Sequence, residues 1–275
     1  MKQFYFMSGL PRSGSTLLTA LLNQNPNIHA STNSPLLDTI HYTEEYLLKN
    51  SEQYKANPKP ECAHKVLSSI PYNYYFNTPE NIIVDKSRGW VNQIEHIKDY
   101  ITKEPKIICP VRDIHDIISS FLYLIQKSST TSFIDKGLIE RNIPITNDNR
   151  ADYLMSSEGS IGLCYHALSE AYRKGNDKYL LLVDYDDLVK NPQQELNKLY
   201  DFLEIPKFTH NFDSVRTKED EDDSVYQLEN MHTVRDKVEK IHRDNTKFLS
   251  KYILNKYKNM EFWKNRTQKY SIFGL

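Results

Sequence analysis

The chain has 275 residues, of which 26% are charged and 39% hydrophobic, with a formal net charge of −1 at pH 7. This length suits one domain with a single core, which we expect to span residues 1–275. The balanced charge argues against nucleic-acid binding through bulk positive charge. No apolar run approaches the roughly 20 residues that cross a bilayer, and no secretory leader precedes the first strand. We therefore expect a soluble, cytoplasmic protein without a membrane span.

A strand, a small-residue loop and a helix follow one another at the N-terminus. Phe4–Met7 is an apolar run of strand type, and leucines at 17, 18, 21 and 22 mark one face of a helix. In such a unit the loop N–H groups and the helix N-terminus converge on one point. The sequence therefore predicts an anion site in the loop between them, although a strand-to-helix turn without a ligand is the alternative.

The loop has the glycine spacing of the phosphate-binding pattern G-x-x-x-x-G-K-[ST], with Gly9 and Gly14 in the two glycine positions. Where that pattern carries lysine, this chain has Ser15, and the nearby cation is Arg12 inside the loop. The loop thus predicts a cradle for a phosphate-like group without ATP or GTP turnover.

Strands alternate with helices along the rest of the chain. We expect extended segments at 28–30, 81–86, 106–111 and 179–183, with helices at about 34–49, 63–76, 114–125, 162–173 and 192–203. This alternation predicts an α/β fold with a central parallel sheet flanked by helices. Residues 127–160 are polar and lack period, which predicts a lid or a mobile insertion.

Arg112 and Ser120 form a second candidate anion site. Arg112 follows the buried-type strand 106–111, and Ser120 lies about two turns into the next helix, after Asp113 at its start. Ligands of open α/β sheets bind at the carboxyl ends of the strands. An arginine fork and a hydroxyl can bind one anion there, and a surface pairing of Arg112 with Asp113 or Asp116 is the alternative.

Three segments resemble sulfotransferases that use 3′-phosphoadenosine 5′-phosphosulfate (PAPS). Gly9–Leu18 resembles the family's 5′-phosphosulfate loop, in a form close to tyrosylprotein sulfotransferases and uncharacterised bacterial relatives. Arg112, followed eight positions later by Ser120, is similar to the 3′-phosphate motif. Residues 179–203 resemble the run of strand, Tyr-Glu-Asp-Leu, Pro and helix, with Asp186 in place of the family's Glu.

The resemblance implies a three-layer P-loop-like domain that moves a sulfuryl group from PAPS to a hydroxyl or amine. It implies catalytic roles for Arg12 and Lys86 and no metal. The acceptor would be a small molecule, a glycan or a peptide. The implied cofactor-binding residues are Pro11, Arg12, Ser13, Gly14, Ser15, Thr16, Leu17, Arg112, Ser120, Tyr185 and Arg235.

The resemblance does not supply a general base. The glutamate of tyrosylprotein sulfotransferases falls on Asn33, and the histidine of the small-molecule branch falls on Arg88. Other candidates near the carboxyl edge of the sheet are Asp85, His41, Asp38 and Glu44. Two alternative functions stay open, a P-loop small-molecule kinase and a non-catalytic nucleotide-binding protein.

The C-terminal part combines an acidic run with an aromatic tail. Glu219–Asp223 is typical of a solvated loop, with docking of a basic partner as the alternative. Residues 248–273 predict a helix followed by aromatic side chains packed on the domain. Cys62, Cys109 and Cys164 are far apart and odd in number, which argues against a disulfide framework and a thiolate metal site.

Overall fold

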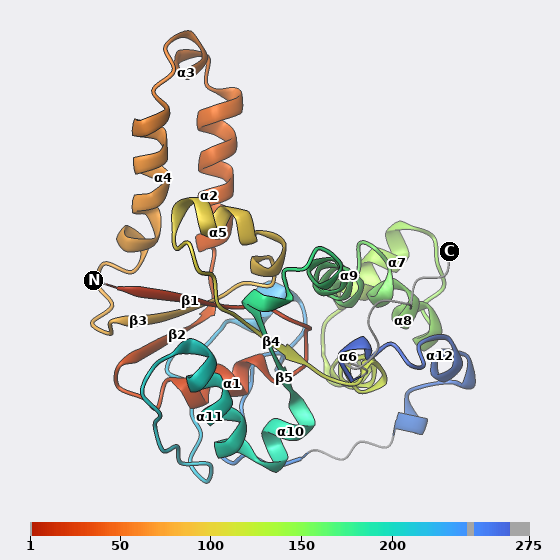
Figure 1. Cartoon of the computed structure of the whole chain (residues 1–275). Helices are drawn as coiled ribbons and strands as arrows, with labels where there is room; N and C mark the ends of the chain where they lie inside the picture. Colours follow the sequence, from red (N-terminus) through yellow and green to blue (C-terminus); the bar gives the residue numbers. More distant parts are fainter. Residues whose placement is uncertain (1, 241–244, 265–275) are drawn as a thin grey trace.

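A computed structural model of the chain describes residues 2–240 and 245–264 (Figure 1). Its sheet has five parallel strands in the order β2-β3-β1-β4-β5, where β1 is Gln3–Met7, β2 is Ile28–Asn33, β3 is Ile82–Lys86, β4 is Ile107–Val111 and β5 is Leu180–Asp184. The α-helices are α1 (Ser15–Leu22), α2 (Leu36–Glu44), α3 (Glu52–Ala56), α4 (Pro60–Tyr74), α5 (Ile94–Tyr100), α6 (Ile114–Lys127), α7 (Phe133–Glu140), α8 (Asn147–Met155), α9 (Ser160–Arg173), α10 (Tyr185–Lys190), α11 (Pro192–Leu203) and α12 (Lys251–Lys256). The expected α/β fold with a central parallel sheet is confirmed.

Short helices of other types complete the chain. A π-helical turn, η1 (Glu45–Asn50), continues α2, and the 3₁₀ turns are η2 (Trp90–Asn92), η3 (Asp177–Tyr179), η4 (Asp223–Tyr226), η5 (Asn245–Lys247) and η6 (Phe262–Lys264). In Figure 1, α2, α3 and α4 rise together away from the sheet as an arm.

Two apolar layers form because successive side chains of a strand point to opposite faces. Phe4 and Phe6 of β1 pack in one core cluster, to which α2, α5, α6 and α9 contribute. Tyr5 and Met7 pack in the other, with α1 and α11. Helices thus cover both faces of the sheet, as the three-layer prediction requires.

Several expected boundaries were wrong. Strand β2 continues through Asn33, three residues beyond the extended segment expected at 28–30, and the helix expected at about 63–76 runs from Pro60 to Tyr74. The expectation of an irregular segment at 127–160 is also wrong, because α7 and α8 occupy it and bury Ile134, Leu138, Ala151 and Leu154. Polar residues on the outer faces of these short helices obscured their period. That this segment moves as a lid stays a prediction.

The C-terminal part is less regular than expected. Only α12 and the turns η5 and η6 are helical in residues 245–264, and Trp263 is buried against the core. Two residues of the expected aromatic tail, Tyr270 and Phe273, lie outside the described residues. Cys109 and Cys164 are buried free thiols, and Cys62 is exposed.

Candidate active site

The carboxyl ends of all five strands bring the predicted site residues to one edge of the sheet. Strand register pairs Met7 with Lys86 and Lys86 with Asn33, so β1, β3 and β2 end side by side. On the other side of β1, Val111 of β4 pairs with Asp184 of β5. The loop after β1, Arg112 after β4 and Tyr185 after β5 therefore face one region.

Two glycines shape the loop after β1. Gly9 has φ +85°, and a Cβ there would lie 2.4 Å from the carbonyl oxygen of Pro110. Gly14 has φ +88°, and a Cβ there would lie 2.7 Å from the Tyr185 ring. Both positions require a residue without Cβ, because the left-handed conformation and the close neighbour each exclude one. The loop therefore follows β4 closely and places the N-terminus of α1 beside Tyr185.

Arg12 crosses the site from this loop. Its backbone is also left-handed, with φ 56°. Its Nε donates to Ser120 Oγ at 3.2 Å, and its Nη1 donates to the carbonyl oxygen of Met231. Arg12 thus joins the loop after β1, helix α6 and the C-terminal part of the chain.

Arg112 lies flat against Tyr185, with its Cζ 4.3 Å from the ring centroid. Its Nη2 pairs with Asp116 at 3.3 Å, which is one of the alternatives open from the sequence, and its Nη1 donates to the carbonyl oxygen of Arg12 at 3.4 Å. The buried Nε of Arg112 has no hydrogen-bond partner among the described residues. Since a buried donor without a partner is costly, this atom indicates a site for an anion.

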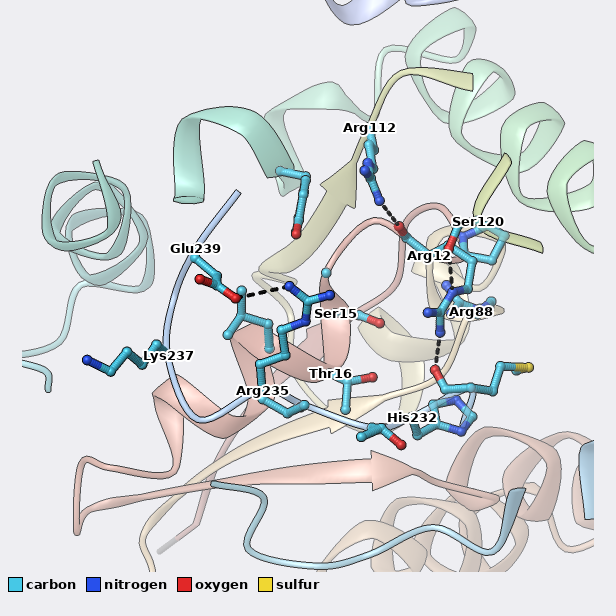
Figure 2. Close-up of a pocket in the computed structure, with 17 residues that line it drawn as sticks. Arg12, Ser15, Thr16, Arg88, Arg112, Ser120, His232, Arg235, Lys237 and Glu239 are labelled. Carbon is cyan, nitrogen blue, oxygen red and sulfur yellow. Dashed lines mark hydrogen bonds and ion pairs between the residues drawn. The ribbon is translucent and has the colours of Figure 1, made fainter. Parts of the chain in front are cut away.

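A cavity unites these groups (Figure 2). It is lined by Pro11, Arg12, Gly14, Ser15, Thr16, Leu17, Arg88, Arg112, Ser120, Tyr185, residues 231–235, Lys237 and Glu239. Every predicted cofactor-binding residue except Ser13 lines it. Ser13 is buried, and its hydroxyl donates to the carbonyl oxygens of Leu10 and Pro110. The side chain of Ser13 therefore holds the loop on β4 and is directed away from the cavity.

Residues 217–239, here called the covering segment, begin beside Glu80, just before β3, and reach the carboxyl ends of β2 and β3 at Asn33 and Lys86. Lys86 does not line the cavity, because Glu221 of this segment covers it. Lys86 Nζ lies 3.1 Å from Glu221 Oε1, and the two side chains are only 4% and 8% exposed. The amide of Asn33 donates to the other oxygen of Glu221 at 2.7 Å. The prediction of a solvated loop is therefore wrong at Glu221, whose side chain is buried, although Glu219, Asp220 and Asp222 are exposed.

Burial and charge act against each other in this ion pair. Burial lowers the pKa of Lys86, and the charge of Glu221 only partly restores it. Burial also disfavours the charged form of Glu221, but Lys86 and His232 outweigh this effect and hold the pKa of Glu221 below its ordinary value. The carboxylate of Glu221 is therefore the anion that Lys86 binds in this structure.

Among the residues that the structure describes, the four base candidates named from the sequence lie outside the cavity lining. Asp85 was expected beside Lys86, but neighbouring strand residues face opposite sides. Asp85 is fully buried, where it accepts hydrogen bonds from Tyr75 at 2.5 Å and Trp90 at 2.7 Å, and burial raises its pKa. Asp38, His41 and Glu44 lie on α2, in the arm.

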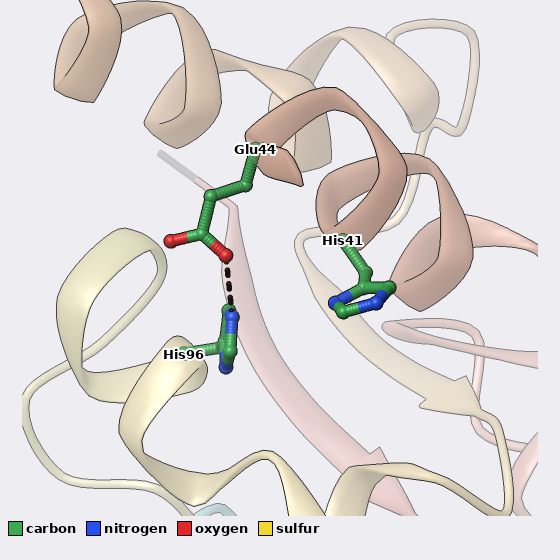
Figure 3. A group of neighbouring side chains, drawn as sticks. All are labelled: His41, Glu44 and His96. Atoms are coloured by element: carbon green, nitrogen blue, oxygen red, sulfur yellow. Dashed lines mark hydrogen bonds and ion pairs between the residues drawn. The ribbon is translucent and has the colours of Figure 1, made fainter. Parts of the chain in front are cut away.

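Figure 3 shows His41 and Glu44 beside His96 of α5. Possible ligand atoms of the three side chains lie within 4.8 Å of one another. Both oxygens of Glu44 already accept hydrogen bonds, from His96 at 2.6 Å and from Tyr100 at 2.7 Å. These bonds tie the arm to α5, and they explain the cluster without a metal ion.

Several residues at the site could not be recognised from the sequence. Arg88 was named only as the place of a missing histidine, and it lines the cavity. Glu221, Asp223 and His232 also lie at the site, because Asp223 contacts His232 and His232 lines the cavity. One weak signal existed: Met231–Arg235 has no acidic residue, and seven residues separate it from the end of the acidic run Glu219–Asp223.

The comparisons with known proteins agree with this geometry. The sequence profile of the sulfotransferase domain matches residues 3–268. Protein-tyrosine sulfotransferase A of Caenorhabditis elegans is 19% identical over 203 residues, which cover 74% of this chain and 50% of that protein. Protein-tyrosine sulfotransferase of Drosophila melanogaster is 20% identical over 207 residues, which cover 73% of this chain and 38% of that protein. The chain therefore spans half or less of these relatives.

A solved structure shares the fold. Mouse sulfotransferase SULT7A1 complexed with PAP superposes with a TM-score of 0.54 at 14% identity, covering 96% of this chain and 84% of that chain. In the described part of this chain, no helix is both long and apolar enough to cross a membrane. Because the profile covers nearly the whole sequence, the chain belongs to the sulfotransferase domain family.

Proposed function

We propose that the protein transfers a sulfuryl group from PAPS to an acceptor hydroxyl or amine. The observation that carries the proposal is the composition of the cavity. Arg12, Arg88, Arg112, Arg235 and Lys237 line it, and Glu239 is the only carboxylate among the lining residues. Such a cavity favours a ligand with several negative charges.

Two anion sites in the cavity fit the two ends of this donor. The backbone N–H groups of residues 12–17, which include the start of α1, would hold the 5′-phosphosulfate. Arg112, with its unpartnered Nε, and Ser120 would hold the 3′-phosphate. Tyr185 and Arg235 line the same cavity and would contact the nucleotide between these ends.

Arg12 and Lys86 would act on the transferring group. As the sulfuryl group leaves, negative charge grows on the oxygen that joined it to the 5′-phosphate. Fixed cations stabilise such charge more in the transition state than in the ground state. The donor's sulfuryl group would take the place of the Glu221 carboxylate on Lys86.

A P-loop kinase is less consistent with the site. Such an enzyme needs a loop lysine that reaches the terminal phosphates, and Ser15 occupies that position. A non-catalytic nucleotide-binding protein would need the cavity but not the buried Lys86 at the strand end. PAPS-dependent transfer uses both features.

The test is transfer of labelled sulfur from PAPS to an acceptor panel that begins with a tyrosine peptide and simple phenols. The tyrosine peptide comes first because the relatives are named protein-tyrosine sulfotransferases. Phosphate-labelled ATP is supplied to a parallel reaction. Sulfated product without phosphorylated product supports the proposal, and the reverse result supports the kinase.

A further inference from the structure

A carboxylate and an imidazole of the covering segment form a tight pair at the site. His232 Nδ1 lies 2.6 Å from Asp223 Oδ1, and the backbone N–H of His232 donates to Asp223 Oδ2 at 3.0 Å. A carboxylate only accepts hydrogen bonds, so in the neutral ring Nδ1 carries the proton. Asp223 therefore fixes both the orientation of the ring and its tautomer.

The opposite nitrogen of the ring is the acceptor. With Nδ1 protonated, the lone pair of the His232 ring is on Nε2, where it accepts a hydrogen bond from the amide nitrogen of Asn33 at 3.2 Å. The same amide donates to Glu221 at 2.7 Å, so its two hydrogens have two distinct acceptors. The contact with Asn33 shows that a hydrogen-bond donor can reach Nε2 of His232. The Asn33 amide itself cannot accept a proton.

His232 lies where an acceptor and the donor would meet. It lines the nucleotide cavity and also a second cavity, of about 540 Å³, that contains Glu221 and Asp223. Its neighbour Met231 accepts a hydrogen bond from Arg12, which fixes this stretch beside the catalytic arginine. Figure 2 shows His232 in the cavity below Arg12 and Arg88.

We infer that His232 is the general base of the proposed sulfuryl transfer and that Asp223 is its positioning residue. The inference rests on the proposed function. A bond forms between the acceptor oxygen and sulfur, while the bond from sulfur to the 5′-phosphate oxygen breaks. The acceptor proton moves to Nε2 of His232, and the electron pair of the broken bond stays on the phosphate. The products are the sulfated acceptor and adenosine 3′,5′-bisphosphate (PAP).

The charges around the ring set its pH response. Burial holds the pKa of His232 below its ordinary value, while Glu221 and Asp223 act to raise it and Lys86 acts to lower it. The ring of Tyr226 packs 5.1 Å away. His232 is therefore neutral at pH 7 and able to accept a proton.

The first test compares two phenols as acceptors for labelled PAPS. Phenol keeps its proton at mildly alkaline pH and needs a base, whereas 4-nitrophenol is largely ionised there and does not. We expect His232→Gln to lower kcat/KM for phenol by about 10²–10⁴-fold and to change that for 4-nitrophenol far less. The exposed His64, in the arm, gives the control variant His64→Gln, which should match the parent protein.

Equal losses with both phenols, or no loss with phenol, would overturn the assignment. Transfer to neither phenol by a parent protein that binds PAP would overturn it as well, because no hydroxyl would then reach Nε2. Imidazole added to His232→Ala should restore phenol transfer in part. Absence of this rescue, where His232→Ala binds PAP normally, counts against a proton-transfer role.

Asp223→Asn tests the positioning role through a pH profile. Protonation of His232 inactivates the base, so the acidic limb of kcat/KM reports its pKa. Loss of the Asp223 charge lowers that pKa, so the limb should move to lower pH as the rate falls. Asp236→Asn, an exposed change in the same segment that lines neither cavity, should leave the limb in place. An unmoved limb in Asp223→Asn would contradict the role of Asp223.

An error in the proposed function and an error in the base assignment give different experimental results. If the parent protein responds to PAP no better than to AMP and transfers no labelled sulfur, the proposed function is wrong. If it binds PAP and sulfates phenols, but His232→Gln treats both phenols alike, only the base assignment is wrong.

Discussion

The two halves of the active site are built in different ways. The strand-end half comes from five parallel strands whose register fixes Asn33, Lys86 and the loop after β1 relative to one another. The covering segment has one 3₁₀ turn, η4, and is held by individual side-chain and backbone contacts. Its anchors are Glu221 on Lys86, Met231 on Arg12, and the backbone contact of Val215 just before it with Asp236.

The strand-end half and the covering segment therefore contribute different groups to the site. The strand-end half presents cations and N–H groups whose backbone positions are set by the sheet. The covering segment adds Asp223, His232 and Glu221, and its position depends on charge. A charged donor that competes with Glu221 for Lys86 would therefore weaken one anchor of the covering segment, which links donor binding to the geometry of the proposed base.

The largest expected effect concerns the buried ion pair between the halves. Glu221→Ala leaves Lys86 buried without a counter-ion, which typically costs about 3–5 kcal/mol. Replacing both partners in Lys86→Met/Glu221→Leu removes the unpaired charge and should recover most of that loss. Urea unfolding measures the free energies, and a double variant no more stable than Glu221→Ala would contradict this account.

The same pair gives a pH dependence. The pKa of Glu221 lies below its ordinary value of 4.5 in the folded protein, against the effect of burial and because of Lys86 and His232. This group therefore contributes stability above pH 4.5 that is lost as the pH falls through the folded pKa. The stability of the parent protein should fall more steeply in acid than that of Glu221→Gln. Parallel curves for the two proteins would show that the pair does not stabilise the fold.

The second prediction concerns the role of Lys86 in the rate. Lys86→Met/Glu221→Gln is compared with Glu221→Gln, so that neither protein holds a Glu221 carboxylate without its partner. Loss of a cation that acts on the transition state typically lowers kcat by about 10²–10³-fold. PAP binding should change little, since in the proposed mechanism Lys86 acts on the sulfuryl group, which PAP lacks. A defect confined to donor affinity would instead place Lys86 in ground-state binding.

The control for this comparison is Lys240→Met. Lys240 forms an exposed ion pair with Asp186 just beyond the covering segment, and surface pairs contribute little. Its kcat should equal that of the parent protein.

The strand-end half could be predicted from the sequence because each part of it is local. A strand, Gly9, Gly14 and a leucine face specify the loop within about twenty residues. Arg112 and Ser120 lie on one strand-to-helix junction, and both line the cavity. That Arg12 reaches Ser120 was not predictable, because it depends on the left-handed backbone of Arg12.

The covering segment could not be predicted because its contacts join distant residues. Glu221 meets Lys86 across 135 positions, and His232 meets Asn33 across 199. Nothing local distinguishes Glu221 from its exposed neighbours in an acidic run. The missing base was sought near the strand ends, whereas the only imidazole in the cavity lining comes from this segment.

The third prediction tests the strand-end half alone. In the proposed arrangement PAP would engage both anion sites, whereas AMP lacks the 3′-phosphate and would engage one. A ligand at 100 times its Kd adds about 2.7 kcal/mol, or about 5–10 °C in melting temperature for a chain of this size. PAP should therefore raise the melting temperature well above the value with equal AMP or ATP.

Arg112→Ala should remove most of this preference and keep the weaker AMP response. Arg173→Ala removes an arginine from an exposed pair with Glu170 and serves as the control, with the preference intact. Equal shifts from ATP and PAP, or an unchanged preference in Arg112→Ala, would show that the 3′-phosphate binds elsewhere.

The smallest expected effect is that of a chelator. Labelled-sulfur transfer should persist in excess EDTA, because arginine and lysine side chains supply the positive charge around the donor, whereas a P-loop kinase would stop. Loss of activity restored by Mg²⁺ would contradict the mechanism. Loss restored by Zn²⁺ but not Mg²⁺ would direct attention to His41, Glu44 and His96, since nitrogen ligands suit zinc. Glu44→Gln tests the zinc explanation, because it removes the carboxylate of this cluster and leaves every residue that lines the cavity unchanged.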